Sequence, residues 1–209
     1  MKMEGADLIH WIEEVNKQIK QHKSDLTKLD QAIGDGDHGI NLVRGFEAVL
    51  EKLMPKQDQD LGAICQEIGM TLVTRVSGAA GPLYGTAFLK MAQVWKGKNA
   101  ISWVELAQGI DAAAQGMKTR GRCKLGDKTL LDVWLPLADF LLQQGENASW
   151  EELEKLAFAK MEYTKTLEAR RGRAAFLGSR SIGHLDPGAV SSYLIFRALA
   201  QVMKAKEME

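Results

Sequence analysis

Apolar residues along this chain recur with the 3.6-residue period of an α-helix, and this pattern constrains the fold more than any other feature of the sequence. Three apolar stripes span residues 8–19, 40–53 and 61–76, and Pro55 should end the second one. Further helices are predicted over 82–95, 103–119 and 150–169. No stretch shows the alternation expected of a β-strand, so the chain is expected to be all-α.

Two short motifs mark helix starts inside this pattern. The stretches "SWVE" at 102–105 and "SWEE" at 149–152 both fit a capping box, in which a serine accepts a bond from the backbone N–H three residues on and a glutamate reaches back. Asp186 is the expected N-cap of the last helix, with Pro187 in its first turn.

One more helix is predicted within "GDKTLLDVWLPLADFLLQQ" at 126–144, with a kink at Pro136. The total is about eight helices with mostly short connections, which is typical of an antiparallel bundle. No internal repeat or long linker divides the chain. We therefore predict a single all-α domain over residues 1–209, with the five tryptophans in its core or at an interface.

Charge balance and cysteine usage argue against several classes of function. The 209 residues carry a formal net charge of zero, which argues against non-specific binding to nucleic acid or to an anionic membrane surface. Cys65 and Cys123 have no metal-type or redox spacing, so reduced thiols are expected. Since neither a signal peptide nor a membrane-spanning stretch is evident, we expect a cytoplasmic protein.

A loop after the first stripe collects negative charge. The stretch "LDQAIGDGDHGINL" at 29–42 contains Asp30, Asp35 and Asp37, interleaved with glycines. Two carboxylates about 4 Å apart repel by about 4 kcal/mol at an effective dielectric of 20, so the loop must spread them into solvent, protonate them or bind a cation. The spacing is not that of an EF-hand, but the oxygens suit Mg²⁺ or Ca²⁺. A metal site and an Asx-rich turn that caps the helix near His38 both stay open.

Two further glycine-rich loops are candidates for function. The stretch "SGAAGPLYG" at 77–85 could present backbone N–H groups to an anion, or could form a plain turn between helices. The stretch "GRCKLGDKT" at 121–129 has the glycine spacing of a P-loop. Asp127 stands where that loop needs lysine, and a helix precedes it, so we reject the P-loop interpretation.

The last loop, "EARRGRAAFLGSRSIGHLDPGA" at 168–189, is rich in arginine. Its four arginines suit either a solvated loop or the neutralisation of phosphate near the helix start at Asp186. His10, His22 and His184 have no evident partner, and no Ser-His-Asp or Cys-His arrangement can be defended.

In this order, "GDGDHGINL", "SGAAGPLYGT", "GDKTLLDVW" and "GRAAFLGSRSIGHLDPGA" resemble the L subunit of bacterial dihydroxyacetone kinase. The resemblance runs from the first helix to the last. It implies an eight-helix antiparallel barrel with a nucleotide at one end. It also implies a pair of Mg²⁺ ions held at the positions that match Asp30, Asp35 and Asp37.

The same resemblance implies a set of nucleotide contacts. The residues against the diphosphate would be His38, Gly39, Ile40, Asn41, Ala79 and Ala80. Gly121 and Leu130 would line the adenine pocket. Arg173 would meet phosphate and stabilise charge, and the turn of Asp186, Pro187 and Gly188 would close the site.

One loop departs from the family pattern, which usually reads Gly-Gly-x-Ser-Gly-Pro. This chain has Ser77 for the first glycine and Ala80 for the serine. The expected hydroxyl contact to phosphate is therefore absent, which puts affinity or phosphoryl-transfer competence in question. A neutral hydrogen bond contributes about 0.5–1.5 kcal/mol net, so nucleotide binding should survive.

The resemblance implies a phosphotransferase subunit of the phosphotransferase-system type. ADP would stay bound as a coenzyme, a phosphohistidine on an M subunit would phosphorylate it to ATP, and the γ-phosphoryl group would pass to dihydroxyacetone on a K subunit. No residue of this chain would act as a nucleophile. Two alternatives stay open: a module that reports ADP or ATP state to a transcriptional regulator, and an ATP-dependent kinase subunit for another small acceptor.

Overall fold

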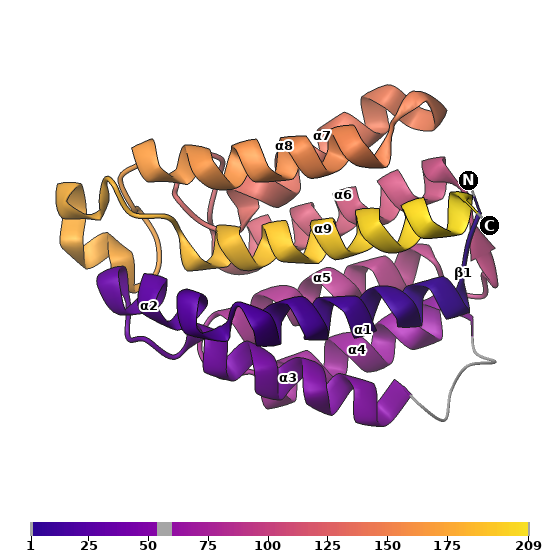
Figure 1. The fold of residues 1–209 in the computed structure, drawn as a ribbon, viewed down its shortest axis with the longest axis horizontal. Coiled ribbons are helices and arrows are strands. Elements are labelled where there is room, and N and C mark those ends of the chain that lie inside the picture. Colours follow the sequence, from indigo (N-terminus) through magenta and orange to yellow (C-terminus); the bar gives the residue numbers. More distant parts are fainter. Residues whose placement is uncertain (1, 54–59, 209) are drawn as a thin grey trace.

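The computed structural model describes residues 2–53 and 60–208, and helices make up most of it (Figure 1). The elements are β1 (Met3–Glu4), α1 (Gly5–Gln21), α2 (Lys23–Ile33), α3 (His38–Leu53), α4 (Leu61–Arg75), α5 (Ala80–Val94), β2 (Ala100–Ile101), α6 (Trp103–Gly121), α7 (Leu131–Gln144), η1 (Gly145–Asn147), α8 (Trp150–Tyr163), η2 (Thr164–Thr166), η3 (Arg173–Ser181) and α9 (Pro187–Glu207). The two short strands form one antiparallel pair. The all-α prediction is confirmed.

Eight of these helices contact one another in a closed circuit. Each packs on the next in the order α1, α3, α4, α5, α6, α7, α8 and α9, and α9 packs on α1. Successive helices run in opposite directions, and α2 extends beyond α1 at one end of the bundle (Figure 1). The loops that follow α2, α4, α6 and α8 therefore lie at that end. This order supports the barrel that the resemblance implies, which itself stays a prediction.

A continuous apolar core fills the bundle, and tryptophans are prominent in it. Trp11, Trp95 and Trp134 are fully buried, while Trp103 stacks on Trp150 with ring centroids 4.2 Å apart. Each large aromatic side chain buries about 150–250 Å², so these residues contribute strongly to packing. Of the two positions expected for the tryptophans, core or interface, the burial of all five supports the core.

The helix starts predicted from capping residues are confirmed. Ser102 and Ser149 each accept a hydrogen bond from the backbone N–H three residues on, at 3.4 and 3.1 Å. Asp186 does the same at 2.7 Å, and Pro187 is the first residue of α9. These signals are reliable because each depends on residues within one turn.

The sequence reasoning missed α2 and extended α8 too far. Only two side chains of α2 are buried, so its apolar stripe is too short to stand out. The helix predicted to reach residue 169 ends at Tyr163. Beyond that point, Lys128 binds the carbonyl oxygens of Thr164 and Leu167, which a continuing helix would need as acceptors for its own N–H groups.

Two prolines were predicted to shape helices, and a membrane-spanning helix was not expected. Pro55 lies outside the described residues, although α3 does end at Leu53. Pro136 lies inside α7, and its kink stays a prediction. No helix in the described part of the chain has the length and apolar character needed to cross a membrane.

Candidate functional site

The four loops at the α2 end of the bundle enclose a cavity of about 410 Å³. Segments that are far apart in the sequence meet here. The predicted site residues that line the cavity are Asp30, Asp35, Asp37, His38, Asn41, Ala79, Ala80, Gly121, Leu130, Arg173, Asp186, Pro187 and Gly188. The antiparallel order of the helices is what brings these loops to the same end.

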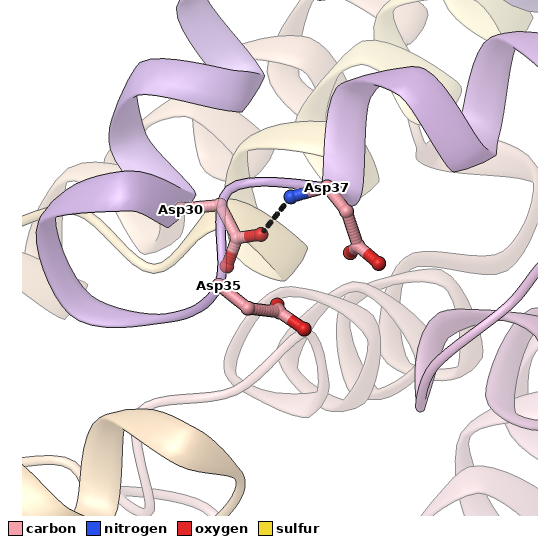
Figure 2. A group of neighbouring side chains, drawn as sticks. All are labelled: Asp30, Asp35 and Asp37. Atoms are coloured by element: carbon pink, nitrogen blue, oxygen red, sulfur yellow. Dashed lines mark hydrogen bonds between the residues drawn. The ribbon is translucent and has the colours of Figure 1, made fainter.

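The three aspartates form a cluster where α2 leads into α3 (Figure 2), and all three line the cavity. Each offers a carboxylate oxygen, and these oxygens all lie within 4.8 Å of one another. Asp30 Oδ2 accepts hydrogen bonds from the backbone N–H of Asp37 at 2.9 Å and of His38 at 3.1 Å. The Asp30 carboxylate therefore caps the start of α3, and the turn and metal-site interpretations are compatible.

Glycine is required next to this cluster for steric reasons. A Cβ atom at Gly34 would lie 2.1 Å from Asp30 Oδ1, so any side chain there would displace the carboxylate. Gly36 has a φ of +77°, which other residues rarely adopt. These glycines let the loop fold tightly around the Asp30 carboxylate.

The donor set of this cluster fits Mg²⁺. Carboxylate oxygens are hard ligands, and Mg²⁺ usually combines a few of them with water and phosphate oxygens. Arg173 Nη2 lies 2.9 Å from Asp35 Oδ2, with the arginine side chain 70% exposed. Since an exposed ion pair contributes at most about 1 kcal/mol, this contact can readily be exchanged for one to phosphate.

Asn41 presents an unpaired donor on the cavity wall. Its Oδ1 accepts a hydrogen bond from Arg44 Nη2 at 2.9 Å, but its buried Nδ2 has no partner among the described residues. A buried donor left unpaired costs about 1–3 kcal/mol, so an acceptor such as a phosphate oxygen fits this position. Arg44 Nη2 also donates to Ser77 Oγ at 2.8 Å, which gives a role to the serine that replaces the expected glycine.

A buried chain of hydrogen bonds ends at His38. Its Nε2 lies 2.9 Å from Ser191 Oγ, which lies 2.6 Å from Tyr84 Oη. Tyr84 Oη lies 2.9 Å from Ser192 Oγ, which accepts a bond from Trp134 Nε1 at 3.0 Å. Burial lowers the pKa of His38, although nearby aspartates oppose this shift. The chain fixes the orientation of the imidazole, because the bond at one ring nitrogen sets the role of the other.

The N-terminus of α5 opens onto the same cavity. Ser77, Gly78, Ala79 and Ala80 line it, and no side chain of the described residues caps α5 at Ala79. Uncapped N–H groups at a helix start attract anions. Because Ala80 has no hydroxyl group, an anion here would depend on backbone donors.

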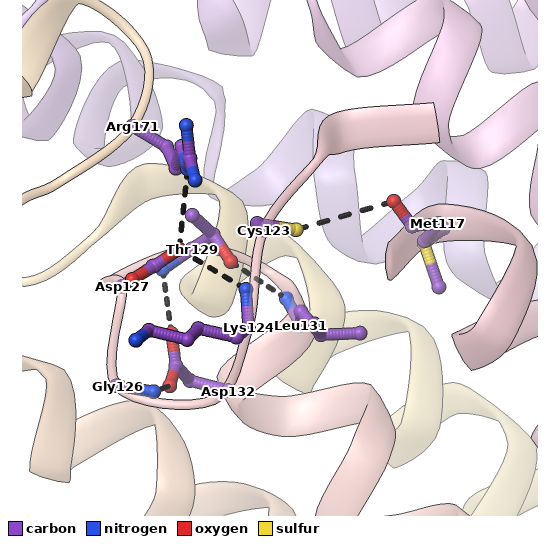
Figure 3. A network of polar contacts seen from close by, with 9 residues as sticks. All are labelled: Met117, Cys123, Lys124, Gly126, Asp127, Thr129, Leu131, Asp132 and Arg171. Carbon is purple, nitrogen blue, oxygen red and sulfur yellow. Dashed lines mark hydrogen bonds and ion pairs between the residues drawn. The ribbon is translucent and has the colours of Figure 1, made fainter. Parts of the chain in front are cut away.

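Carboxylates hold the loop that joins α6 to α7 (Figure 3). Asp132 accepts hydrogen bonds from the backbone N–H of Gly126 at 2.5 Å and of Thr129 at 2.7 Å. Asp127 Oδ2 accepts a bond from Arg171 Nε at 3.2 Å. Burial raises the pKa of Asp132. The aspartate that excluded a P-loop thus connects this loop to the arginine-rich one.

Asp186 lines the cavity and caps α9. Burial raises its pKa to about 7, and the negative charge of Asp132 adds to the shift. The hydrogen bond from Ala189 N–H and the positive charge of Lys128 oppose the shift. A carboxyl group in this state changes charge near neutral pH.

Gly39 and Ile40 are predicted contact residues, but neither belongs to the lining of the cavity in the described structure. A Cβ atom at Gly39 would lie 2.4 Å from Lys23 O, so this glycine lets α3 pack on α2. Ile40 is 48% exposed. Their contact with a nucleotide stays a prediction. The cavity lining in the described structure also does not include His10, His22 or His184.

Sequence reasoning missed several lining residues, of which Lys128 is the most unusual. This residue is only 1% exposed, and burial lowers the pKa of its ammonium group. Thr129 and Arg120 also line the cavity. The available signal was weak, because a lysine in a charged loop is normally solvated and the oxygens around it belong to the backbone of a distant segment.

The family of the chain is shown by comparison with known proteins. The DAK2 domain family matches residues 32–201. The ADP-binding subunit DhaL of PEP-dependent dihydroxyacetone kinase 1 from Listeria innocua is 42% identical over 193 residues, which cover 92% of this chain and 94% of that protein. The corresponding ADP-binding subunit from Escherichia coli is 39% identical over 209 residues, which cover 98% and 100%.

Solved structures agree with this assignment. The native dihydroxyacetone kinase of C. freundii matches with a TM-score of 0.73 and 25% identity, over 93% of this chain and 34% of that one. This chain therefore spans about a third of that kinase. The same kinase in complex with AMP-PNP and Mg²⁺ shares the fold, with a TM-score of 0.74 at 23% identity over 96% of this chain and 34% of that one. The chain belongs to the DAK2 domain family, whose members include the ADP-binding subunits of PEP-dependent dihydroxyacetone kinases.

Proposed function

We propose that this chain is the nucleotide-binding phosphotransferase subunit of a dihydroxyacetone kinase that uses phosphoenolpyruvate as its phosphoryl source. The chain would hold ADP, which a phosphohistidine of an M subunit would phosphorylate to ATP, and the γ-phosphoryl group would then pass to dihydroxyacetone on a K subunit. The observation that carries the proposal is the arrangement of the cavity. The cavity is lined by three carboxylates whose oxygens lie within 4.8 Å of one another and by Asn41, whose buried Nδ2 has no partner among the described residues. The start of α5, which no described side chain caps, opens onto the same cavity.

Charge balance supports a metal-bound nucleotide. Asp30, Asp35 and Asp37 would hold a pair of Mg²⁺ ions, which neutralise the phosphates and the charge that develops in transfer. Three carboxylates and a diphosphate carry about six negative charges, against about four positive charges on two Mg²⁺ ions. Arg173 and the helix N-termini offset part of the remainder.

The residues of the chain would bind and orient. His38, Asn41 and the Ala79–Ala80 backbone would contact the diphosphate, while Gly121 and Leu130 would lie against the base. Cys123 lines the cavity, but burial raises the pKa of its thiol, so it is a poor nucleophile. We therefore assign catalysis to positioning and charge neutralisation, as in other phosphoryl transferases.

The test is to purify the protein with Mg²⁺ and without added nucleotide, denature it, and analyse the supernatant by anion-exchange chromatography. Near-stoichiometric ADP supports a coenzyme that stays bound between turnovers. An empty protein that binds ATP reversibly contradicts the coenzyme role and favours either an ATP-dependent kinase subunit for another small acceptor or a module that reports ADP or ATP state.

A second candidate is a module that reports ADP or ATP state to a transcriptional regulator. The observation that favours it is Ala80, which removes a phosphate-binding hydroxyl from the α5 start without removing the cavity. Turnover of dihydroxyacetone with the K and M partners would exclude this as the sole role. The cytoplasmic location stays a prediction for both candidates.

A further inference from the structure

Residues 164–186 connect α8 to α9 and contain the arginine-rich stretch. We call this segment the arginine-rich loop, and hydrogen bonds join its two ends. Gly183 N–H donates to Lys165 O at 2.8 Å, and Asp186 N–H donates to Thr164 Oγ1 at 3.1 Å. A compact surface loop closed at its base in this way behaves as one unit. Residues 164–167 and 183–186 form its neck.

The ammonium group of Lys128 is bound at this neck. Its Nζ donates to Thr164 O at 2.7 Å and Leu167 O at 3.1 Å on one side, and to His184 O at 2.5 Å on the other. A lysine ammonium has three N–H donors, and all of them are used here. Lys128 therefore holds both sides of the neck, although it belongs to the loop between α6 and α7.

The backbone of Lys128 also indicates a constrained position. Its φ is +61°, a left-handed conformation that is uncommon for a residue with a side chain. Non-glycine residues in such conformations persist where the surrounding structure holds them. The loop around it is fixed by the bonds from Gly126 and Thr129 to Asp132.

The two loops joined by Lys128 contribute different parts of the cavity. The α6–α7 loop carries Leu130, which the proposed function places at the base of the nucleotide. The arginine-rich loop carries Arg173 and ends at Asp186, which the proposed function places at the phosphates. A second link runs parallel, since Asp127 O accepts a bond from the N–H of Arg170 at 3.0 Å.

We propose that Lys128 is a positioning residue that holds the phosphate side of the nucleotide site in register with its base side. This inference rests on the proposed function for the identity of the ligand, but the link between the loops is a property of the chain itself. A lysine that only stabilised the fold would affect binding of the base and of the phosphates alike. A positioning lysine should affect binding of ADP much more than binding of adenosine, which has no phosphate.

The experiment compares Lys128→Met with the matched control Lys124→Met, which removes an exposed ammonium from the same loop. Met is an unbranched, flexible side chain like Lys, and at position 128 it must adopt the same left-handed backbone conformation. The comparison of Lys128→Met with the wild type therefore isolates the effect of the ammonium group. Hydrogen exchange is measured first on nucleotide-free protein. Calorimetric titrations with ADP and with adenosine follow, both with Mg²⁺ present.

Lys128→Met should speed amide exchange over 164–186 by about tenfold or more, while α1 and α4 change little. The Kd of this variant for ADP should rise by about tenfold or more, which is the effect expected when the phosphates lose one charged hydrogen bond. Its Kd for adenosine should change by less than about threefold. Lys124→Met should match the wild type both in amide exchange and in its Kd values for ADP and adenosine. Unchanged exchange over 164–186, or equal losses for ADP and adenosine, would overturn the proposal.

A milder variant covers the case in which Lys128→Met does not fold. Asp127→Asn weakens the contact to Arg171 without leaving carbonyl groups unpaired, and it should produce the same selective loss of ADP binding at about threefold. This variant leaves Lys128 in place but weakens the parallel link between the same two loops. Equal losses of ADP and adenosine binding would show that the link between the loops does not act selectively on the phosphate side, which would also overturn the proposal. If the wild type binds no ADP, the proposed function fails, while the exchange data still decide whether Lys128 joins the loops.

Discussion

The two ends of the helix bundle start most of their helices in different ways, although α9 at the cavity end keeps a local cap at Asp186. At the end away from the cavity, α4, α6 and α8 each begin with a side chain that caps its own helix, namely Asp60, Ser102 and Ser149. At the cavity end, the cap of α3 comes from Asp30 on another helix. No described side chain caps α5 at Ala79.

This contrast separates stability from binding within one fold. A local cap contributes about 1 kcal/mol and satisfies the helix start without help from a ligand. The cavity end instead keeps carboxylates close together and leaves donors unpaired, both of which lower stability in the free protein. We infer that the cavity end is completed by what it binds.

The largest effect should follow from Asp35→Ala. Loss of one carboxylate of the cluster should lower phosphoryl transfer by about 100-fold or more in an assay reconstituted with K and M partners. Asp60→Ala is the control at the opposite end, and it should cost about 1 kcal/mol of unfolding free energy with transfer retained. Full activity of Asp35→Ala would contradict the metal assignment.

A smaller effect concerns pH and Asp186. The pKa of about 7 in the folded protein lies above the ordinary value, so the folded state holds a proton that the unfolded state has lost. This contribution to stability is complete below about pH 4 and is lost as pH rises through 7. Between pH 5 and pH 8 the loss should reach about 2–3 kcal/mol.

Asp186→Asn removes this titration while keeping a residue that can cap α9. Urea unfolding in EDTA without nucleotide, measured across that pH range, should be flatter for the variant than for the wild type. Parallel pH profiles of the two proteins would show that Asp186 does not titrate there.

Gly34→Ala tests the geometry of the cluster with all three carboxylates still present. The new Cβ atom would lie 2.1 Å from Asp30 Oδ1 and must move that carboxylate. We expect Mg²⁺ affinity to fall by about tenfold, within the range seen when groups that orient metal ligands are changed. Titration calorimetry with Mg²⁺ and ADP measures this, and an unchanged affinity would mean that the position of Asp30 is unimportant.

The smallest effect should come from Ala80→Ser, which restores the hydroxyl of the family pattern. One added hydrogen bond to phosphate should tighten ADP binding by about three- to tenfold. Ser149→Ala, at the opposite end, serves as a control that lowers stability without altering ADP affinity. If Ala80→Ser binds ADP no better, phosphate does not lie at the α5 start.

Local features of the fold could be predicted from the sequence, whereas distant contacts could not. The caps at Ser102, Ser149 and Asp186 depend on bonds that reach only three residues, so their motifs were sufficient. In α2, only two side chains are buried, and periodicity alone could not reveal it. Asp30 was therefore placed in a loop rather than near the end of a helix.

The candidate site shows the same limit. Most of its predicted residues were identified by resemblance, and all of these except Gly39 and Ile40 line one cavity. The pairing of Arg173 with Asp35, and the bonds of Lys128 to carbonyl groups, join segments that only the folded chain brings together. Backbone acceptors leave no trace in residue types, so a buried lysine of this kind could not be distinguished from a solvated one.

The strand β1 and the last turn of α9 lie together at the end opposite the cavity, where Lys206 Nζ lies 2.5 Å from Asp7 Oδ2 (Figure 1). Adjacent ends remote from a binding site allow insertion, fusion or circular permutation with little disturbance. The domain can therefore operate as a module, attached to a larger polypeptide through either end while its cavity stays accessible.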